Sequence, residues 1–212
     1  MYSRHDLVWL TPTGWDAAIA RAPHAALSLW RARDWPAVVR RHEDGVPANT
    51  VCLGMPLPLS FGARQRLALV AHREHVARCQ APLPLADALS SAPPALLAGL
   101  VALQRAALVD LRVFGSLAMQ SLTGLPYVRA QSDIDLLFTP ATHAELEAGL
   151  ALLAEASTVL PLDGEIVFAD GAAVAWKEWL AARRDGARVL VKSMDGVRLM
   201  HPAALALACA TS

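Results

Sequence analysis

The residues most capable of chemistry lie in the second half of this 212-residue chain. Asp133 and Asp135 are separated by one residue within an otherwise apolar run, SDIDLL. In an extended strand, residues two apart project from the same face, and two carboxylates there repel each other unless a cation lies between them. Mg²⁺ takes oxygen ligands and commonly bridges carboxylates to substrate phosphates. The pair therefore predicts a metal site for phosphoryl or nucleotidyl transfer.

A candidate phosphate-binding turn precedes this pair in the chain. Leu111–Phe114 has the pattern of a short strand that ends at Gly115 and Ser116, and residues 117–122 have a helical pattern. Unpaired backbone amides and the helix dipole favour a phosphate at a helix N-terminus. Glycine lets the backbone approach closely, and the Ser116 hydroxyl can add a hydrogen bond. We expect Gly115 and Ser116 to bind substrate.

A third carboxylate on a neighbouring strand would complete a two-metal clamp for in-line displacement at phosphorus. The segment LDGEIVF offers Asp163 and Glu165. Glu165 is the preferred third catalytic acid because it lies inside the apolar part of the segment. By alternation Asp163 shares the face of Glu165, so the spacing leaves both open as metal ligands.

The segments that must position these residues alternate between strands and helices. A Thr142–Glu145 capping box starts one of the helices, and Gly186 lies just past the end of another. The expected helices span residues 93–110, 117–122, 142–157 and 176–184, and the expected strands 111–114, 133–138, 164–169, 188–192 and 197–200. This alternation predicts an α/β (α+β) catalytic domain over residues 83–212, a mixed sheet with flanking helices.

The first half of the chain has a different character. Strands are expected at residues 6–10, 36–41, 51–55 and 66–71, with a helix at 15–21. Residues 1–82 carry 10 basic residues and 6 acids (+4), whereas residues 83–212 carry 9 basic residues and 13 acids (−4). Composition and charge both change at Pro82–Pro84, which predicts a linker there. Residues 1–82 are therefore expected to form a small β-rich domain that binds substrate or a partner.

Composition excludes several classes of protein. The formal net charge is +0, which argues against a dedicated nucleic-acid-binding protein, and 55% hydrophobic residues argue against disorder. The longest apolar run, 95–103, is too short to cross a bilayer. Cys52, Cys79 and Cys209 have no metal-ligand spacing and are expected to be free thiols. With no apolar leader at the N-terminus, these features predict a cytoplasmic protein without a membrane partner.

Together these motifs resemble the polymerase-beta-like nucleotidyltransferase superfamily, whose hallmark is Gly-Ser, then Asp-x-Asp, then a later acid. Across its length the chain is similar to one family in particular, the malonate decarboxylase holo-acyl-carrier-protein synthases, also called phosphoribosyl-dephospho-CoA transferases. The resembling stretches, in family order, are Arg4–Leu10, Val38–Arg41, Val113–Ser116, Gln120–Leu125, Ser132–Leu137, Leu162–Phe168, Val174–Trp179 and Val189–Ser193.

The resemblance implies a reaction and its partners. A phosphoribosyl-dephospho-CoA group would pass from 2′-(5″-triphosphoribosyl)-3′-dephospho-CoA to a serine of the apo acyl-carrier subunit of malonate decarboxylase, releasing pyrophosphate. Mg²⁺ is the implied cofactor, held by Asp133 and Asp135 as by the matching pair of the family. Pyrophosphate leaves with negative charge, which a metal ion and backbone amide donors can stabilise.

Other side chains have two interpretations each. Arg40 and Arg41 can grip phosphates or the acidic carrier protein, or they are solvated residues at a strand end. Lys192 can neutralise a phosphate or lie free on a hairpin. Trp176 and Trp179 are three residues apart on an expected helix, and we expect them to pack in the core rather than to stack on a base. His5 has no metal-ligand spacing and is not expected to be a ligand.

Two other functions remain open at this point. One is a nucleotidyltransferase that uses ATP or CTP on another acceptor, which the large non-catalytic N-terminal half disfavours. The other is a catalytically inactive scaffold, which predicts loss of metal-binding carboxylates. All the candidate carboxylates are present in this chain.

Overall fold

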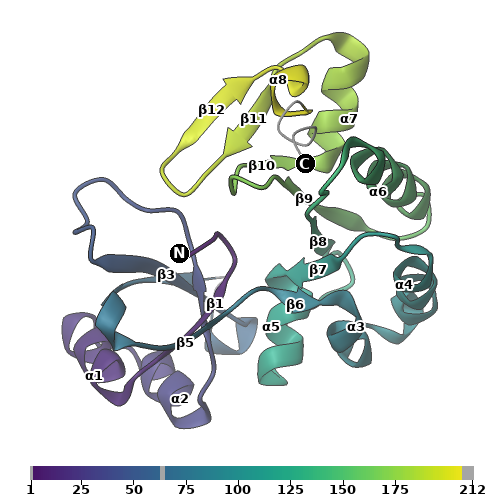
Figure 1. Cartoon of the computed structure of the whole chain (residues 1–212). Helices are drawn as coiled ribbons and strands as arrows, with labels where there is room; N and C mark the ends of the chain where they lie inside the picture. The colour runs from purple at the N-terminus through teal and green to yellow at the C-terminus, as the bar shows by residue number, and fades with distance from the viewer. Residues whose placement is uncertain (1, 63–64, 207–212) are drawn as a thin grey trace.

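Two β-sheets organise the chain, which the computed structural model describes over residues 2–62 and 65–206 (Figure 1). The first sheet has the strand order β4-β3-β2-β1-β5, and the second has the order β12-β11-β10-β9-β8-β7-β6. The first sheet is antiparallel throughout, whereas the second pairs β8 with β9 in parallel. An antiparallel sheet and a mixed sheet, with helices packed around them, confirm the predicted α+β class.

The first sheet belongs to the N-terminal part of the chain. Its elements are β1 (Leu7–Leu10), α1 (Pro12–Arg21), α2 (Ala25–Arg33), β2 (Ala37–Val39), β3 (Thr50–Leu57), β4 (Gln65–His72) and β5 (Val76–Gln80). Helix α1 begins where Thr11 Oγ1 accepts a hydrogen bond from the Gly14 amide at 3.1 Å and proline occupies the first turn. Trp15, Leu27 and Trp30 pack from the two helices onto the sheet. Burial of these apolar side chains stabilises the packing of both helices on one face of the first sheet.

The second sheet occupies the rest of the chain. Its strands are β6 (Leu83–Pro84), β7 (Leu111–Phe114), β8 (Ile134–Phe138), β9 (Leu162–Val167), β10 (Ala173–Ala175), β11 (Val189–Lys192) and β12 (Val197–Met200). The helices are α3 (Leu85–Ala88), α4 (Pro94–Ala106), α5 (Gly115–Thr123), α6 (His143–Ala156), α7 (Trp176–Asp185) and α8 (Pro202–Ala206).

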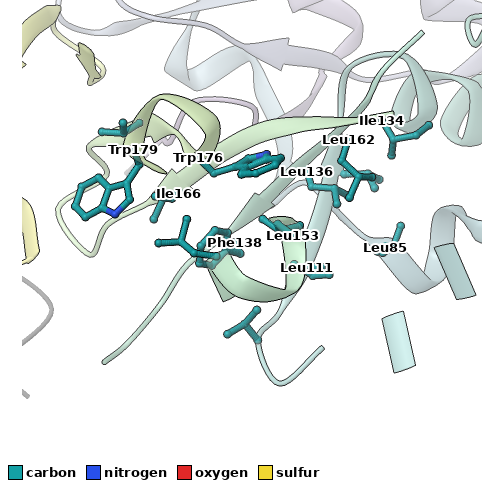
Figure 2. Close-up of a cluster of buried hydrophobic side chains, with 14 of the residues drawn as sticks. Leu85, Leu111, Ile134, Leu136, Phe138, Leu153, Leu162, Ile166, Trp176 and Trp179 are labelled. Atoms are coloured by element: carbon teal, nitrogen blue, oxygen red, sulfur yellow. The ribbon is translucent and has the colours of Figure 1, made fainter. Parts of the chain in front are cut away.

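One face of the second sheet is packed against helices. Figure 2 shows Leu136, Phe138 and Ile166 of the sheet among buried side chains that include Trp176 and Trp179. Both tryptophans are almost fully buried in this apolar cluster, so they are core residues, in agreement with the favoured interpretation. Because side chains alternate along a strand, Asp135 and Glu165 lie on the opposite face of the sheet. The core thus fixes the strands that present the carboxylates.

Several elements were missed or misjudged from the sequence, and β5, β6, α3 and α8 were not expected at all. Helix α2 was not expected, since a nine-residue Arg-rich segment with a weak apolar face has little periodicity. Strand β10 was missed because its three residues run directly into α7. Helix α4 ends at Ala106 rather than near residue 110, and β9 begins at Leu162 rather than at residue 164. The remaining expected elements are present, with ends shifted by a few residues.

Hydrogen bonds connect the N-terminal part of the chain with the part that contains the second sheet. The His42 amide donates to the Met194 carbonyl at 2.8 Å, and Tyr127 Oη donates to the Pro56 carbonyl at 2.8 Å. Helix α5 shares its side chains between both cores, with Leu117 in the core of the second sheet and Met119 in that of the first. The N-terminal part therefore contacts α5, the segment that follows α5 and the turn between β11 and β12. None of the helices described is long and apolar enough to cross a membrane.

Gly164 provides a first prediction, because it lies between Asp163 and Glu165 and pairs with Leu136 across β8 and β9. Its φ is +140°, and an added Cβ would lie 1.8 Å from the Leu136 carbonyl oxygen. We expect Gly164→Ala to lower the free energy of unfolding by about 2–5 kcal/mol through overpacking and backbone strain. Urea unfolding monitored by tryptophan fluorescence measures this.

Gly196→Ala is the matched control, since a Cβ there meets nothing within 4 Å. Equal unfolding midpoints for the two variants would contradict the described pairing of β8 with β9.

Candidate active site

Asp135 and Asp163 lie side by side on the face of the second sheet that faces away from its helical core. Strand register pairs Phe114 with Asp135 and Asp135 with Asp163, so the three residues form one row across β7, β8 and β9. Neighbouring strands are about 4.8 Å apart, which brings the two carboxylates within reach of one cation. Asp133 immediately precedes β8 and is exposed, whereas Asp135 is half-buried. The sequence placed Asp133 inside the strand, and the strand begins one residue later.

The Gly-Ser turn lies directly against Asp135. Gly115 begins α5 with φ +66°, and a Cβ at this position would lie 2.1 Å from Asp135 Oδ2. Glycine is therefore required both by the left-handed backbone and by the approach of the carboxylate. Phe114 is the N-cap residue of α5 and supplies no side-chain hydrogen bond to it, and Ser116 lies in the first turn of the helix. Backbone amides at a helix N-terminus and a carboxylate thus lie next to each other.

Glu165 has a different environment from the aspartates. It is 5% exposed, and its Oε1 accepts hydrogen bonds from Lys192 Nζ at 2.8 Å and Arg4 Nη2 at 3.1 Å. Its Oε2 lies 3.0 Å from Arg4 Nη1 and 3.4 Å from His5 Nε2. Burial alone would raise the pKa of Glu165, but hydrogen bonds from His5, Arg4 and Lys192 outweigh it and lower the pKa. Glu165 is a carboxylate already neutralised by cations.

Asp163 is much less engaged than Glu165. Its side chain is 47% exposed, and its closest described cation is Lys177, whose Nζ lies 4.0 Å from Oδ1. A half-exposed carboxylate in register with Asp135 can accept a hydrated cation, which a buried and doubly paired one accepts poorly. The geometry therefore separates two acids that alternation alone leaves equivalent.

Arg4 and His5 reach this face from the N-terminal end of the chain, and sequence reasoning did not assign them to the site. His5 has φ +71°, a conformation that is uncommon outside glycine, and its amide donates to the Val39 carbonyl at 2.9 Å. Its ring lies 4.2 Å from the Phe114 ring, next to Gly115. Residue spacing carries no signal of this contact, because 161 residues separate Arg4 from Glu165. The only pointer is the stretch RHDLVWL, which belongs to the family resemblance.

The remaining candidates differ in how they are held. Arg40 donates from Nε to the Leu53 carbonyl at 3.0 Å and forms an ion pair with Glu43, whereas Arg41 is exposed. Lys192, at the end of β11, reaches across β10 to Glu165. The free thiols Cys52 and Cys79 form no disulfide, and Cys209 lies outside the described residues.

Comparison with known proteins identifies the family. The model named "Phosphoribosyl-dephospho-CoA transferase MdcG C-terminal domain" matches residues 84–203, and the corresponding N-terminal domain model matches residues 3–82. The chain belongs to the phosphoribosyl-dephospho-CoA transferase family. Both matched ranges contribute to the charged cluster, since Arg4 and His5 lie in the first, and Glu165 and Lys192 in the second.

Curated relatives of this family match along nearly the whole chain. A phosphoribosyl-dephospho-CoA transferase of Xanthomonas campestris pv. campestris is 42% identical over 210 residues, covering 97% of this chain and 97% of the relative. One from Bradyrhizobium diazoefficiens is 43% identical over 209 residues, covering 93% and 89%. One from Pseudomonas putida is 32% identical over 199 residues, covering 92% of each. No solved structure matches the chain.

The carboxylates fit a Mg²⁺ ion that is shared with a substrate. Within residues 2–62 and 65–206, no three His, Cys, Asp or Glu side chains are gathered closely enough to hold a metal ion by themselves. Asp133 and Asp135 nevertheless supply hard oxygen donors, and the contact of Asp135 with Gly115 puts one of them beside the N-terminus of α5. Mg²⁺ is usually bound through one or two carboxylates with phosphate oxygens and waters completing its shell. The donor set therefore fits a metal that arrives with a polyphosphate.

Proposed function

We propose that this protein transfers the phosphoribosyl-dephospho-CoA group from 2′-(5″-triphosphoribosyl)-3′-dephospho-CoA to a serine of the apo acyl-carrier subunit of malonate decarboxylase. Membership of the phosphoribosyl-dephospho-CoA transferase family supports the transferred group. The observation that carries the proposal is the contact between Asp135 and Gly115 at the N-terminus of α5, which unites a carboxylate with phosphate-binding amides.

In this reaction the serine Oγ attacks the α-phosphorus of the donor triphosphate. A new P–O bond forms, the bond between the α-phosphorus and the bridging oxygen breaks, pyrophosphate leaves, and the serine proton passes to solvent. Gly115 and Ser116 bind phosphate oxygens at the start of α5. Asp133 and Asp135 would hold Mg²⁺, and Asp163, which pairs with Asp135 across β8 and β9, would be the third carboxylate at the metal. When bound, Mg²⁺ neutralises charge on the triphosphate and on the leaving pyrophosphate.

The N-terminal half is the proposed site for the carrier protein. Residues 1–82 carry a balance of +4, and Arg41 is exposed at the end of the short strand β2. An acidic carrier is attracted by such a surface, with a strength that falls as salt screens the charges. Arg40 already donates to the Leu53 carbonyl and pairs with Glu43, so we expect it to contribute less than Arg41 to binding the carrier protein.

Intact-mass spectrometry of the apo acyl-carrier subunit tests the proposal. The subunit is incubated with this protein, Mg²⁺ and the triphosphoribosyl donor, and parallel samples contain ATP or CTP instead. We expect one phosphoribosyl-dephospho-CoA adduct per carrier with the first donor, and no adduct once a chelator removes the metal. Nucleotidylation from ATP or CTP alone would overturn the proposed donor, and an unmodified carrier in every sample would overturn the proposed acceptor.

A further inference from the structure

The charged cluster around Glu165 combines one carboxylate with two permanent cations. Arg4 comes from the segment before β1, Glu165 from β9 and Lys192 from the end of β11. Their side chains are 15%, 6% and 34% exposed. With His5 neutral, the cluster carries a net charge of +1. It is a positive site built from both halves of the chain.

This environment opposes a metal ion at Glu165. Cations surround both carboxylate oxygens: Oε1 accepts hydrogen bonds from Lys192 and Arg4, and Oε2, which has no hydrogen bond of good geometry, lies 3.0 Å from Arg4 Nη1 and 3.4 Å from His5 Nε2. A dication bound there would lie a few ångströms from two positive charges and would be repelled by both. Mg²⁺ also keeps several of its waters, which a buried carboxylate has no room to accept.

Arg4 and Lys192 retain donors that the carboxylate does not use. Arginine has five N–H donors and lysine three, and Lys192 directs one of its hydrogen bonds to Glu165. Arg4 Nη1 is buried and lies 3.0 Å from Glu165 Oε2 without a hydrogen bond of good geometry, whereas Nη2 donates to Oε1 and lies 3.2 Å from His5 Nε2. A guanidinium with unused donors is suited to the planar, bidentate recognition of phosphate.

The position of the cluster suits the outer phosphates of a triphosphate. Glu165 is two residues beyond Asp163 on β9, about 7 Å along the same face, and Asp163 pairs with Asp135. An acidic region for a metal therefore adjoins a basic region on one face of the sheet. A triphosphate whose α-phosphate lies at Asp135 can place its β- and γ-phosphates at the cations.

We propose that Arg4 and Lys192 bind the β- and γ-phosphates of the donor, which leave as pyrophosphate, and that Glu165 is a positioning residue that holds both cations rather than a metal ligand. The inference rests on the proposed function for the identity of the donor. It makes the N-terminal segment part of the phosphate site, with His5 held on Phe114 beside the start of α5.

Calorimetric titration with inorganic tripolyphosphate in metal-free buffer tests the anion site without requiring activity. We expect Arg4→Gln and Lys192→Gln each to weaken tripolyphosphate binding about tenfold or more, because each removes charge-assisted hydrogen bonds. Arg183→Gln is the matched control, because Arg183 pairs with Glu147 on the helices and not on this face. Lys192→Gln leaves the Arg4 ion pair intact, so it remains informative if Arg4→Gln unfolds. Unchanged affinity in Lys192→Gln and a folded Arg4→Gln, or no binding by the unmodified protein, would overturn the proposal.

Steady-state kinetics separates the two roles of Glu165. In a positioning role, Glu165→Gln raises KM for the donor and leaves the Mg²⁺ concentration for half-maximal rate within about twofold. If Glu165 is instead a metal ligand, the Mg²⁺ concentration for half-maximal rate rises in Glu165→Gln. That result would overturn the positioning role. If the protein transfers no group to the carrier, the proposed function fails, while the titration still decides whether Arg4 and Lys192 form an anion site.

Discussion

Replacing Asp135 by asparagine should reduce the rate of group transfer by on the order of a thousandfold while leaving the fold intact. Asparagine keeps the shape of the side chain, so its contact with Gly115 is preserved. It removes the negative charge that attracts Mg²⁺, and with it several kcal/mol of transition-state stabilisation at the triphosphate. Initial rates of adduct formation, followed by intact mass at saturating donor, measure the effect.

Asp133→Asn should also lower the transfer rate, because Asp133 lies two residues before Asp135, directly before β8, and supplies the other proposed metal-binding carboxylate. Asp87→Asn is the matched control, since Asp87 is exposed on α3 away from these carboxylates. An Asp135→Asn variant that transfers the group at the unmodified rate would refute the metal site at this position.

Replacing Glu165 by alanine should lower the free energy of unfolding at pH 7 by about 3–5 kcal/mol, since it leaves Arg4 partly buried without its partner. The pKa of Glu165 is lowered in the folded state from an ordinary value of 4.5, as hydrogen bonds from His5, Arg4 and Lys192 overcome the opposing effect of burial. A group whose folded-state pKa is lowered stabilises the fold above its unfolded-state pKa and loses that effect as the pH falls.

The difference in unfolding free energy between the unmodified protein and Glu165→Ala should therefore be largest near neutral pH and shrink below about pH 4.5. Urea unfolding at pH 7 and at successively lower pH values measures it. Glu147→Ala removes an exposed ion pair with Arg183 and should cost less than about 1 kcal/mol at pH 7. Equal losses for the two variants, or a Glu165→Ala difference that does not change with pH, would contradict the buried ion-pair cluster.

The most specific part of the site was predictable because its geometry is local. Asp133 and Asp135 follow the two-residue period of a strand, and Gly115 follows a strand directly, so each motif carries its own geometry. The contact between Gly115 and Asp135 then follows from the antiparallel pairing of β7 with β8. Elements with strong periodicity and clear ends, such as α6 with its Thr142 cap, were also predictable.

The choice between Asp163 and Glu165 was not predictable, because the two residues have the same parity on one strand. Their environments differ through partners that are remote in the sequence. Arg4 is 161 residues from Glu165 and Lys192 is 27 residues away. No pattern on β9 reports which of its acids will meet these cations.

The sequence by itself determined the fold class, the pairing of a Gly-Ser turn with Asp-x-Asp, and the family to which the chain belongs. Each of these depends on short-range periodicity or on motif order, which a linear sequence contains. Only the tertiary structure decided that Arg4 and His5 lie on the face that carries Asp135 and Asp163, and that Glu165 is buried in ion pairs. The physical reason is that the charge state and accessibility of a side chain depend on its neighbours in space, and packing of the N-terminal segment against the second sheet brings these neighbours together.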